Sequence, residues 1–243
     1  MALIDNLISY WKLDETSGTR ADSHGSNDLT DNNTVGSATG IINNGADFES
    51  TNSEFLSITD AAQSGLDLGA GGTDFSISFW FNAESLPSSG QYRTWFWKWV
   101  GGTNNRQYVI DLTNASGTYK SSILLSSTGS AGAYSSEVNF STSFSTATWY
   151  HFVYVYDASA GELKAYVNAS LEVTHTGTPT SIFDGNGDFK VGAGQGYIDG
   201  VLDEVGVWDR TLDTTEISSL YNGGSALAYP FTSSVNSNFF AFM

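Results

Sequence analysis

The chain of 243 residues contains no cysteine and few basic residues. Without cysteine, disulfide bridges, thiolate metal ligands and cysteine nucleophiles are excluded. Nine Lys and Arg stand against 26 Asp and Glu, which gives a formal charge of -17. This charge would repel a phosphate backbone, and no polybasic segment is present to hold an anionic membrane. Nucleic acid and anionic membranes are therefore not expected as partners.

Long apolar runs are absent as well. No segment stays apolar over the roughly twenty residues that a membrane-spanning helix needs. Residues 1–11 have neither the basic region nor the apolar core of a signal peptide. We therefore expect no membrane insertion and no secretory leader.

What the chain does have is alternation of apolar and polar side chains, the pattern of half-buried β-strands. Every second residue in 75–81 is a large apolar one, and residues 150–156 and 163–167 alternate in a similar way. Turns rich in Gly, Asp and Asn separate these runs. The pattern predicts an all-β fold of two packed antiparallel sheets, a jelly-roll sandwich.

One short helical turn is expected near the C-terminal end of this domain. It follows the strand-like residues 200–208, and Thr214 is a candidate N-cap three residues before Ile217. Residues 222–224, Asn-Gly-Gly, are expected to end the helix because they enter the left-handed conformation cheaply.

Five segments of the sequence together carry a family resemblance: residues 9–18 with 21–28, 44–48 with 55–58, 74–81, 149–157 with 163–168, and 200–222. In this order they resemble the laminin-G-like domains of the concanavalin A-like lectin/glucanase group. The resemblance runs from about Leu7 to Gly224 and implies the same jelly-roll fold. We accordingly expect a β-sandwich domain over residues 1–224 and a separate tail at 225–243. The fold alone does not identify an activity, because one fold hosts many functions.

The resemblance also implies a structural calcium ion. Family members often carry one near an Asp-x-x-Gly-x-Asn turn and a late Asp-Glu strand, which match Asp22, Gly25 and Asn27 and the pair Asp203 and Glu204. These residues offer the oxygen ligands that calcium prefers. Asp203 and Glu204 cannot both face one ion from a regular strand, so one of them is expected to accept hydrogen bonds from turn backbone. The alternative is that Asp22 and Asn27 only shape an Asx-type turn.

Residues 92–100 are the richest candidate for glycan binding, since sugars stack on aromatic faces. Alternation predicts that Trp95, Trp97 and Trp99 share one side of a strand, while Phe96, Lys98 and Val100 face the other. Burial in the core is the alternative fate of these rings. The expected contacts to glycan are Trp97, Trp99, Asn105, Arg106, Tyr134 and Tyr197.

Catalysis is not expected. Glucanases of this fold need a Glu-x-Asp-x-Glu run, and their mechanism requires paired carboxylates. Here Val205 follows Asp203-Glu204, no Gly-x-Ser-x-Gly motif is present, and the three histidines are scattered without zinc-ligand spacing.

The tail at 225–243 has no charged residue and is aromatic. It is expected either to cover a sheet edge or to dock into other virion subunits or a second copy of the chain. Domains resembling this one occur among phage structural proteins, and a missing leader suits a virion protein assembled in host cytoplasm. We therefore expect a virion-associated adhesion domain that binds a cell-surface glycan or polysaccharide. The alternatives are a capsid decoration or fibre protein without sugar affinity, and a carbohydrate-binding module of a secreted hydrolase.

Overall fold

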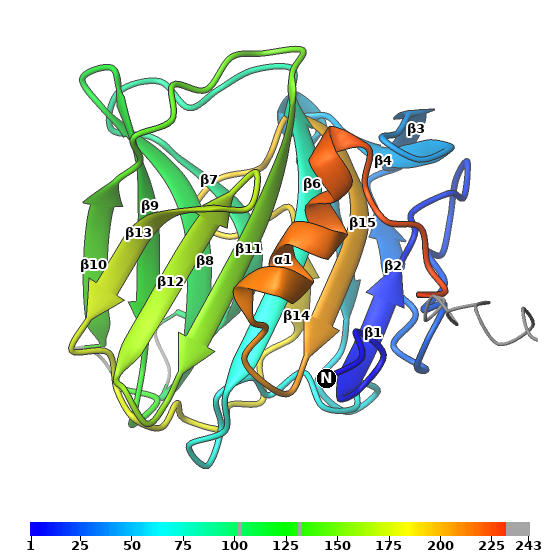
Figure 1. The fold of residues 1–243 in the computed structure, drawn as a ribbon. Coiled ribbons are helices and arrows are strands. Elements are labelled where there is room, and N and C mark those ends of the chain that lie inside the picture. Colours follow the sequence, from blue (N-terminus) through cyan, green and yellow to red (C-terminus); the bar gives the residue numbers. More distant parts are fainter. Residues whose placement is uncertain (102–103, 131–132, 232–243) are drawn as a thin grey trace, which may run out of the picture.

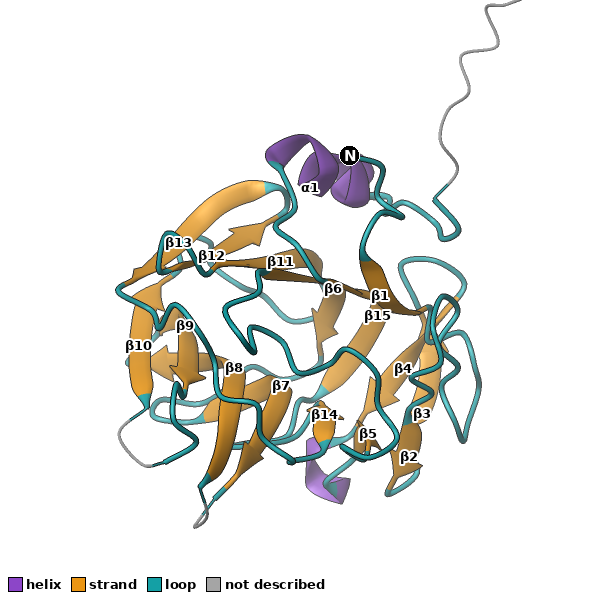
Figure 2. Ribbon diagram, turned by 90° about the horizontal axis from the view of Figure 1, so that it is seen from below, coloured by secondary structure: helices purple, strands orange, loops and turns teal. Residues whose placement is uncertain are grey.

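The computed structural model describes residues 1–101, 104–130 and 133–231. Its strands form two antiparallel sheets that pack face to face, which confirms the all-β jelly-roll prediction (Figures 1 and 2). The first sheet contains β1 (Leu7–Trp11), β3 (Gly36–Thr39), β4 (Asn44–Phe48), β6 (Phe75–Ala83), β11 (Trp149–Asp157), β12 (Glu162–Val167), β13 (Ser170–Thr176) and β15 (Gly200–Trp208). The second contains β2 (Thr30–Asn32), β5 (Phe55–Ile58), β7 (Tyr92–Val100), β8 (Asn105–Ala115), β9 (Thr118–Leu125), β10 (Tyr134–Asn139) and β14 (Phe189–Val191).

Strands distant in sequence are neighbours in both sheets. The first sheet runs β13-β12-β11-β6-β15-β4-β3, with β1 paired to β15. The second runs β10-β9-β8-β7-β14-β5-β2, so the short strand β14 joins β7 to β5. This order decides which side chains meet on the outer face of the second sheet.

An aromatic core fills the space between the sheets. The expected inward face of β6 is buried there, and Phe79 stacks on Phe152 of β11 with ring centroids 5.3 Å apart. Trp95 of the second sheet packs against the Phe152 ring, with ring centroids 4.7 Å apart. Buried aromatics of this size contribute most of the stabilisation of a sandwich core.

Helix α1 (Thr214–Tyr221) covers the outer face of the first sheet, where Ile217 and Leu220 pack in a second apolar cluster with Trp208 (Figures 1 and 2). The expected helix is therefore confirmed, but its N-cap is Asp213, one residue before Thr214. The Asp213 carboxylate accepts hydrogen bonds from two backbone N–H groups of the first turn, and the Glu216 carboxylate accepts a hydrogen bond from the N–H of Asp213 itself.

The helix ends as expected. Asn222 has a φ of 47°, the left-handed conformation that stops an α-helix, and two 3-10 turns complete the helical elements. These turns are η1 (Ser50–Asn52) and η2 (Asn222–Gly224). No helix in the described ranges is long and apolar enough to cross a membrane.

The first residues of the expected tail lie against the first sheet. Tyr229 stacks on Tyr10 with ring centroids 4.8 Å apart, and Phe231 stacks on Trp208 at 6.3 Å. These rings cover the outer face beside β1. Residues 232–243 lie outside the described residues, so docking of the tail into another subunit stays a prediction.

The capping interaction can be tested by one substitution. Asp213→Ala removes the acceptor for the N–H groups of the first helical turn, and we expect it to lower the free energy of unfolding by about 1 kcal/mol. Thr214→Ala is the matched control and should change stability by less than half as much, because Thr214 does not cap the helix. Urea denaturation of both variants measures the difference; equal losses would contradict the assignment of the cap.

Candidate functional site

A bulge in β7 decides which aromatic side chains reach the surface. The pairing of β7 with β8 shifts between Thr94 and Phe96, and both Trp95 and Phe96 are buried in the central core. The expectation that Trp95 shares a face with Trp97 was therefore wrong, because an extra residue breaks the alternation there. Beyond the bulge the alternation holds, and Trp97 and Trp99 are half-buried on the outer face while Lys98 is fully buried.

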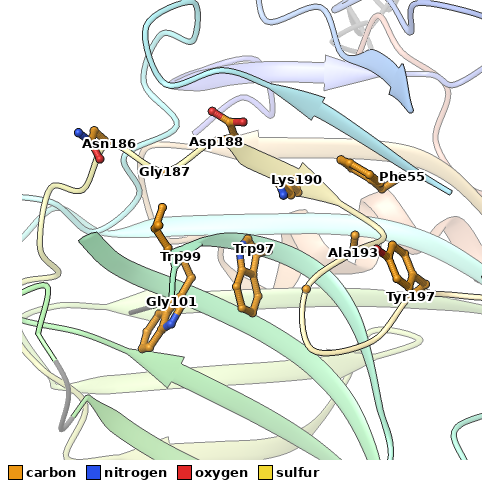
Figure 3. Close-up of a pocket in the computed structure, with 12 residues that line it drawn as sticks. Phe55, Trp97, Trp99, Gly101, Asn186, Gly187, Asp188, Lys190, Ala193 and Tyr197 are labelled. Atoms are coloured by element: carbon orange, nitrogen blue, oxygen red, sulfur yellow. The ribbon is translucent and has the colours of Figure 1, made fainter. Parts of the chain in front are cut away.

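The outer face of the second sheet holds a groove of about 390 Å³ around these two rings (Figure 3). The ring centroids of Trp97 and Trp99 are 6.4 Å apart, and the two planes are tilted by 56°. Phe55 and Tyr197 form the other end of the groove, with ring centroids 6.4 Å apart. The groove is lined by Phe55, Trp97, Trp99, Val100, Gly101, Asn186, Gly187, Asp188, Lys190, Ala193, Gly194 and Tyr197.

Strand pairing brings Lys190 into the middle of this groove. Lys190 of β14 lies opposite Trp97 on one side and Ser57 of β5 on the other. In Figure 3 it accordingly lies between Trp97 and Phe55. Its Nζ is 5.1 Å from the centroid of the Phe55 ring, a cation–π contact.

The buried ammonium of Lys98 fixes one wall of the groove. Its Nζ lies 2.5 Å from Asp60 and 3.0 Å from Asp67, and it donates to the backbone carbonyls of Gly185 and Gly187 at 3.0 and 2.8 Å. A buried charge is tolerated only when it is paired and hydrogen-bonded in this way. The loop that carries Asn186 and Asp188 is thus tied to the inner side of the strand whose outer side carries the two tryptophans.

A second loop, residues 192–197, closes the other side. The Thr94 hydroxyl accepts hydrogen bonds from the N–H groups of Gln195 and Gly196 at 2.9 and 3.3 Å. Gly194 lies so close to Trp97 that a Cβ there would be 2.3 Å from the ring, which leaves room only for glycine. The same loop carries Tyr197, which also lines an adjacent groove of about 400 Å³ together with Tyr92 and Arg93, among other residues.

Asp111 holds this loop through a buried carboxyl. Its Oδ2 accepts a 2.6 Å hydrogen bond from Nε2 of Gln195, and the residue is fully buried under the loop. Burial raises the pKa of Asp111 to about 7, although hydrogen bonds from Thr94 and Gln195 oppose the rise. Loss of the Asp111 proton is therefore less favourable in the folded protein than in water.

The structure brings together most of the residues expected to bind glycan. Trp97, Trp99 and Tyr197 line the groove, and the Arg106 guanidinium lies 5.7 Å from the centroid of the Trp99 ring. Asn105 begins β8 opposite Val100 at one end of the groove.

Tyr134 lies elsewhere, on β10, separated from β7 by β8 and β9. Its hydroxyl donates to the carbonyl of Thr176, and it lines a different pocket with residues of the 177–181 segment. The sequence analysis missed other groove residues, among them Phe55 and Lys190. Their alternation with buried neighbours marks them as outward-facing, but only the order β7-β14-β5 places them beside the tryptophans.

The expected calcium ligands serve backbone turns. The Asp22 carboxylate accepts hydrogen bonds from the N–H groups of Tyr10, His24, Gly25 and Asn27 at 2.9–3.0 Å. Burial opposes its ionisation, but these four N–H groups outweigh burial and hold the pKa of Asp22 below its usual value. This is the geometry of an Asx-type turn.

Gly25 and Asn27 also have local structural roles. A Cβ on Gly25 would lie 2.6 Å from the carbonyl oxygen of Ile8, so the turn packs too closely for a side chain. The Asn27 side chain accepts from the N–H of Ser64 at 2.7 Å and donates to the Ser9 hydroxyl at 2.7 Å. The turn is thereby joined to β1 and to the following loop.

Asp203 and Glu204 have different partners. The pairing of β15 with β6 is irregular here, and Glu204 has a left-handed φ of 50°. Asp203 accepts a 3.0 Å hydrogen bond from the N–H of Ile42, and Glu204 accepts one from the Tyr10 hydroxyl. Burial raises the pKa of Asp203 to about 8 and that of Glu204 to about 7. Within the described ranges, no group of three or more His, Asp and Glu side chains has the arrangement of a metal site. Calcium binding stays a prediction.

Comparison with protein families matches residues 52–218, more than half of the chain, to the model of the concanavalin A-like lectin/glucanases superfamily. The chain belongs to this superfamily. Comparison with curated proteins gives no match.

Solved structures with the same fold include several binding domains. Domain 4 of AbnA, an extracellular arabinanase from Geobacillus stearothermophilus solved with arabinotriose, is 18% identical with a TM-score of 0.65, over 88% of this chain and 97% of that one. The binding domain of Paraclostridial Mosquitocidal Protein 1 is 16% identical with a TM-score of 0.67, and the match covers 91% of this chain and 53% of that one. The binding domain of botulinum neurotoxin DC, solved with SialylT, is 15% identical with a TM-score of 0.66, and the match covers 90% of this chain and 52% of that one. The chain thus spans about half the length of these two toxin domains, and identities this low establish the fold alone.

Substitution of Asp22 tests whether its carboxylate serves only to hold the backbone turn or also binds calcium. Asp22→Ala leaves backbone N–H groups without an acceptor, and we expect a loss of about 2 kcal/mol or more in the free energy of unfolding. The loss should be equal in calcium and in chelator, whereas a calcium ligand would show it only in calcium. Asp188→Ala, which removes an exposed carboxylate, is the control and should leave the unfolding midpoint unchanged in both buffers.

Asp111 gives a pH-dependent prediction. Its folded pKa of about 7 lies above the usual value of 3.8, so the folded state holds this proton more tightly than the unfolded state. Its contribution to stability is therefore present at low pH and is lost as pH rises from about 4 to 7, by at most about 1.4 kcal/mol per pH unit. In the Asp111→Asn variant, the free energy of unfolding should fall less steeply between pH 4 and 7 than in the wild-type protein. The Asp188→Asn variant, which changes an exposed carboxylate, should keep the wild-type slope. Denaturation at a series of pH values measures the slopes; an unchanged slope in Asp111→Asn would refute the assignment.

Proposed function

We propose that this protein is a non-enzymatic carbohydrate-binding domain that holds a glycan in the groove on the second sheet. The observation that carries the proposal is the row of half-buried rings at Trp99, Trp97, Tyr197 and Phe55 (Figure 3). Aromatic rings on a rigid, open surface suit sugars, because the C–H faces of a pyranose or furanose pack flat against them.

The remaining lining supplies polar contacts. Asn186, Asp188 and Lys190 border the rings, and their side chains can donate to or accept from sugar hydroxyls. The loops that carry these groups are fixed, one by the buried Lys98 and the other by Thr94 and Asp111. A preformed site loses little conformational freedom on binding, which favours affinity for a weakly hydrophobic ligand.

The comparisons support binding as the activity. The arabinanase domain was solved with arabinotriose, and the botulinum neurotoxin DC domain with SialylT. Hydrolysis of a glycosidic bond requires two facing carboxyl groups. Among the described residues that line the groove, Asp188 is the single carboxylate. The groove is suited to holding a sugar and not to cleaving one.

Two biological settings suit such a domain. The sequence favours a virion-associated adhesion protein that attaches to host-surface glycans, and this is the setting we propose. The likeness to domain 4 of the arabinanase favours the alternative of a module within a polysaccharide hydrolase. Contacts with virion subunits or with a second copy of the chain stay predictions.

Removal of the tryptophans tests the proposed function. We expect Trp97→Ala and Trp99→Ala each to weaken binding about tenfold or more, because each removes a stacking surface in the centre of the groove. The measurement is affinity electrophoresis against polysaccharides selected on a glycan array. Tyr134→Ala is the matched control, since Tyr134 was expected to bind glycan but lies outside the groove.

The control separates the groove from a general effect of aromatic loss. Tyr134→Ala should keep wild-type affinity, and the unfolding midpoints of all three variants should be measured alongside. Loss of binding in Tyr134→Ala with retention in both tryptophan variants would place the glycan elsewhere. Failure of the wild-type chain to bind any glycan would overturn the proposed function.

A further inference from the structure

Basic residues on the groove face lack acidic partners, although acids outnumber bases by 26 to nine in the chain. Elsewhere, four basic side chains are paired with carboxylates, at Lys98, Lys120, Lys164 and Arg210. The two remaining bases differ: Arg20 donates to backbone carbonyls, and Lys12 lies 6.0 Å from the centroid of the Tyr229 ring. In the described part of the chain, no carboxylate lies within 4.0 Å of Arg93, Arg106 or Lys190. Of the five bases without a carboxylate partner among the described residues, three therefore lie on this face.

Two of these cations are held beside the aromatic rings of the groove. The Lys190 ammonium lies 5.1 Å from the centroid of Phe55, and the Arg106 guanidinium lies 5.7 Å from that of Trp99. Both side chains are half-buried, so part of each remains open to solvent. Arg93 lines the adjacent groove, which shares Tyr197 with the first. The cations therefore lie along the same surface as the stacking rings.

We propose that the ligand of this groove is an acidic glycan, one whose sugars carry a carboxylate or a sulfate. The proposal rests on the proposed function and adds the chemical class of the sugar. A ring of the sugar stacks on Trp97 or Trp99, while its anionic group meets the ammonium of Lys190 or the guanidinium of Arg106. The fork of N–H groups on Arg106 matches the paired oxygens of a carboxylate or sulfate.

The net charge of -17 repels polyanions in general, but at physiological salt most of this repulsion is screened from a group bound in the groove. Screening limits the reach of exposed charges to about 8 Å at 0.15 M ionic strength, so a bound anionic group responds to the charges nearest to it. In the groove those charges are Lys190, Arg106 and, at the 184–188 loop, Asp188. Asp188 is exposed and repels an anion, so its effect on affinity should have the opposite sign to that of Lys190.

Matched pairs of polysaccharides provide the test. The acidic members are polygalacturonate, alginate, polysialic acid and dextran sulfate, and the neutral members are the carboxyl-reduced forms of the first three and plain dextran. Binding is measured by affinity electrophoresis and calorimetry at 0.15 M salt. We expect at least one acidic polymer to bind about tenfold or more tightly than its neutral counterpart. The carboxylated and sulfated arms identify which anionic group is recognised.

Charge variants assign the selectivity to named residues. Lys190→Gln and Arg106→Gln should each reduce affinity for the acidic polymer about three- to tenfold, and should reduce affinity for its neutral form by a smaller factor, because glutamine keeps a hydrogen-bonding group but not the charge. Asp188→Asn should raise affinity for the acidic polymer by a similar factor. Lys164→Gln, which removes a paired lysine on β12 of the first sheet, is the matched control for net charge and should have no effect.

The outcomes separate this inference from the proposed function. Tighter binding of acidic polymers than of neutral ones, with the difference reduced in Lys190→Gln and Arg106→Gln, supports both glycan binding in the groove and the acidic ligand. Equal or tighter binding of the neutral polymers, still lost in Trp97→Ala, overturns the acidic ligand and leaves glycan binding in place. Selectivity that falls equally in Lys164→Gln reflects net charge and also overturns the inference. Failure to bind any member of either series, or any sugar on a glycan array, overturns both.

Discussion

Strand β7 supplies both the core and the surface of the second sheet, and its alternation is the constraint on which the groove depends. Its bulge at Thr94 sends Trp95 inward to pack on Phe152 of the facing sheet. Beyond the bulge, Trp97 and Trp99 face outward while Lys98 is buried. A slip of one residue would exchange these faces, burying the stacking rings and exposing the ammonium. Packing of the core and the shape of the groove are thus set by the same strand register.

Polar groups buried beneath the groove keep its walls in place. Lys98 binds the carbonyl groups of the 184–188 loop, and Asp111 with Thr94 binds the 192–197 loop. Each buried group would be costly without these partners, so the loops are held where the partners are needed. Rigid walls around half-buried rings are what a binding domain requires, and this arrangement links the stability of the sandwich to its proposed function.

Charge is distributed unevenly over the same surface. The protein is strongly acidic and three of its lysines are paired with carboxylates, whereas Lys190 and Arg106 rest on aromatic rings of the groove without carboxylate partners. An aromatic face holds a cation without neutralising it, so the charge stays available to a ligand. The groove can therefore combine apolar stacking with attraction for an anion, within a molecule whose overall charge is strongly negative.

The sequence by itself determined the sandwich, the short closing helix and the aromatic strand at 92–100, because alternation and turn residues are local properties. It also pointed to Trp97, Trp99 and Tyr197 as parts of one site. Only the tertiary structure decided that Trp95 belongs to the core, that Phe55 and Lys190 join the groove and that Tyr134 does not. It also showed that Asp22 binds four backbone N–H groups. Bulges, strand order and the partners of a carboxylate arise from contacts between distant segments, and periodicity along the chain carries no record of them.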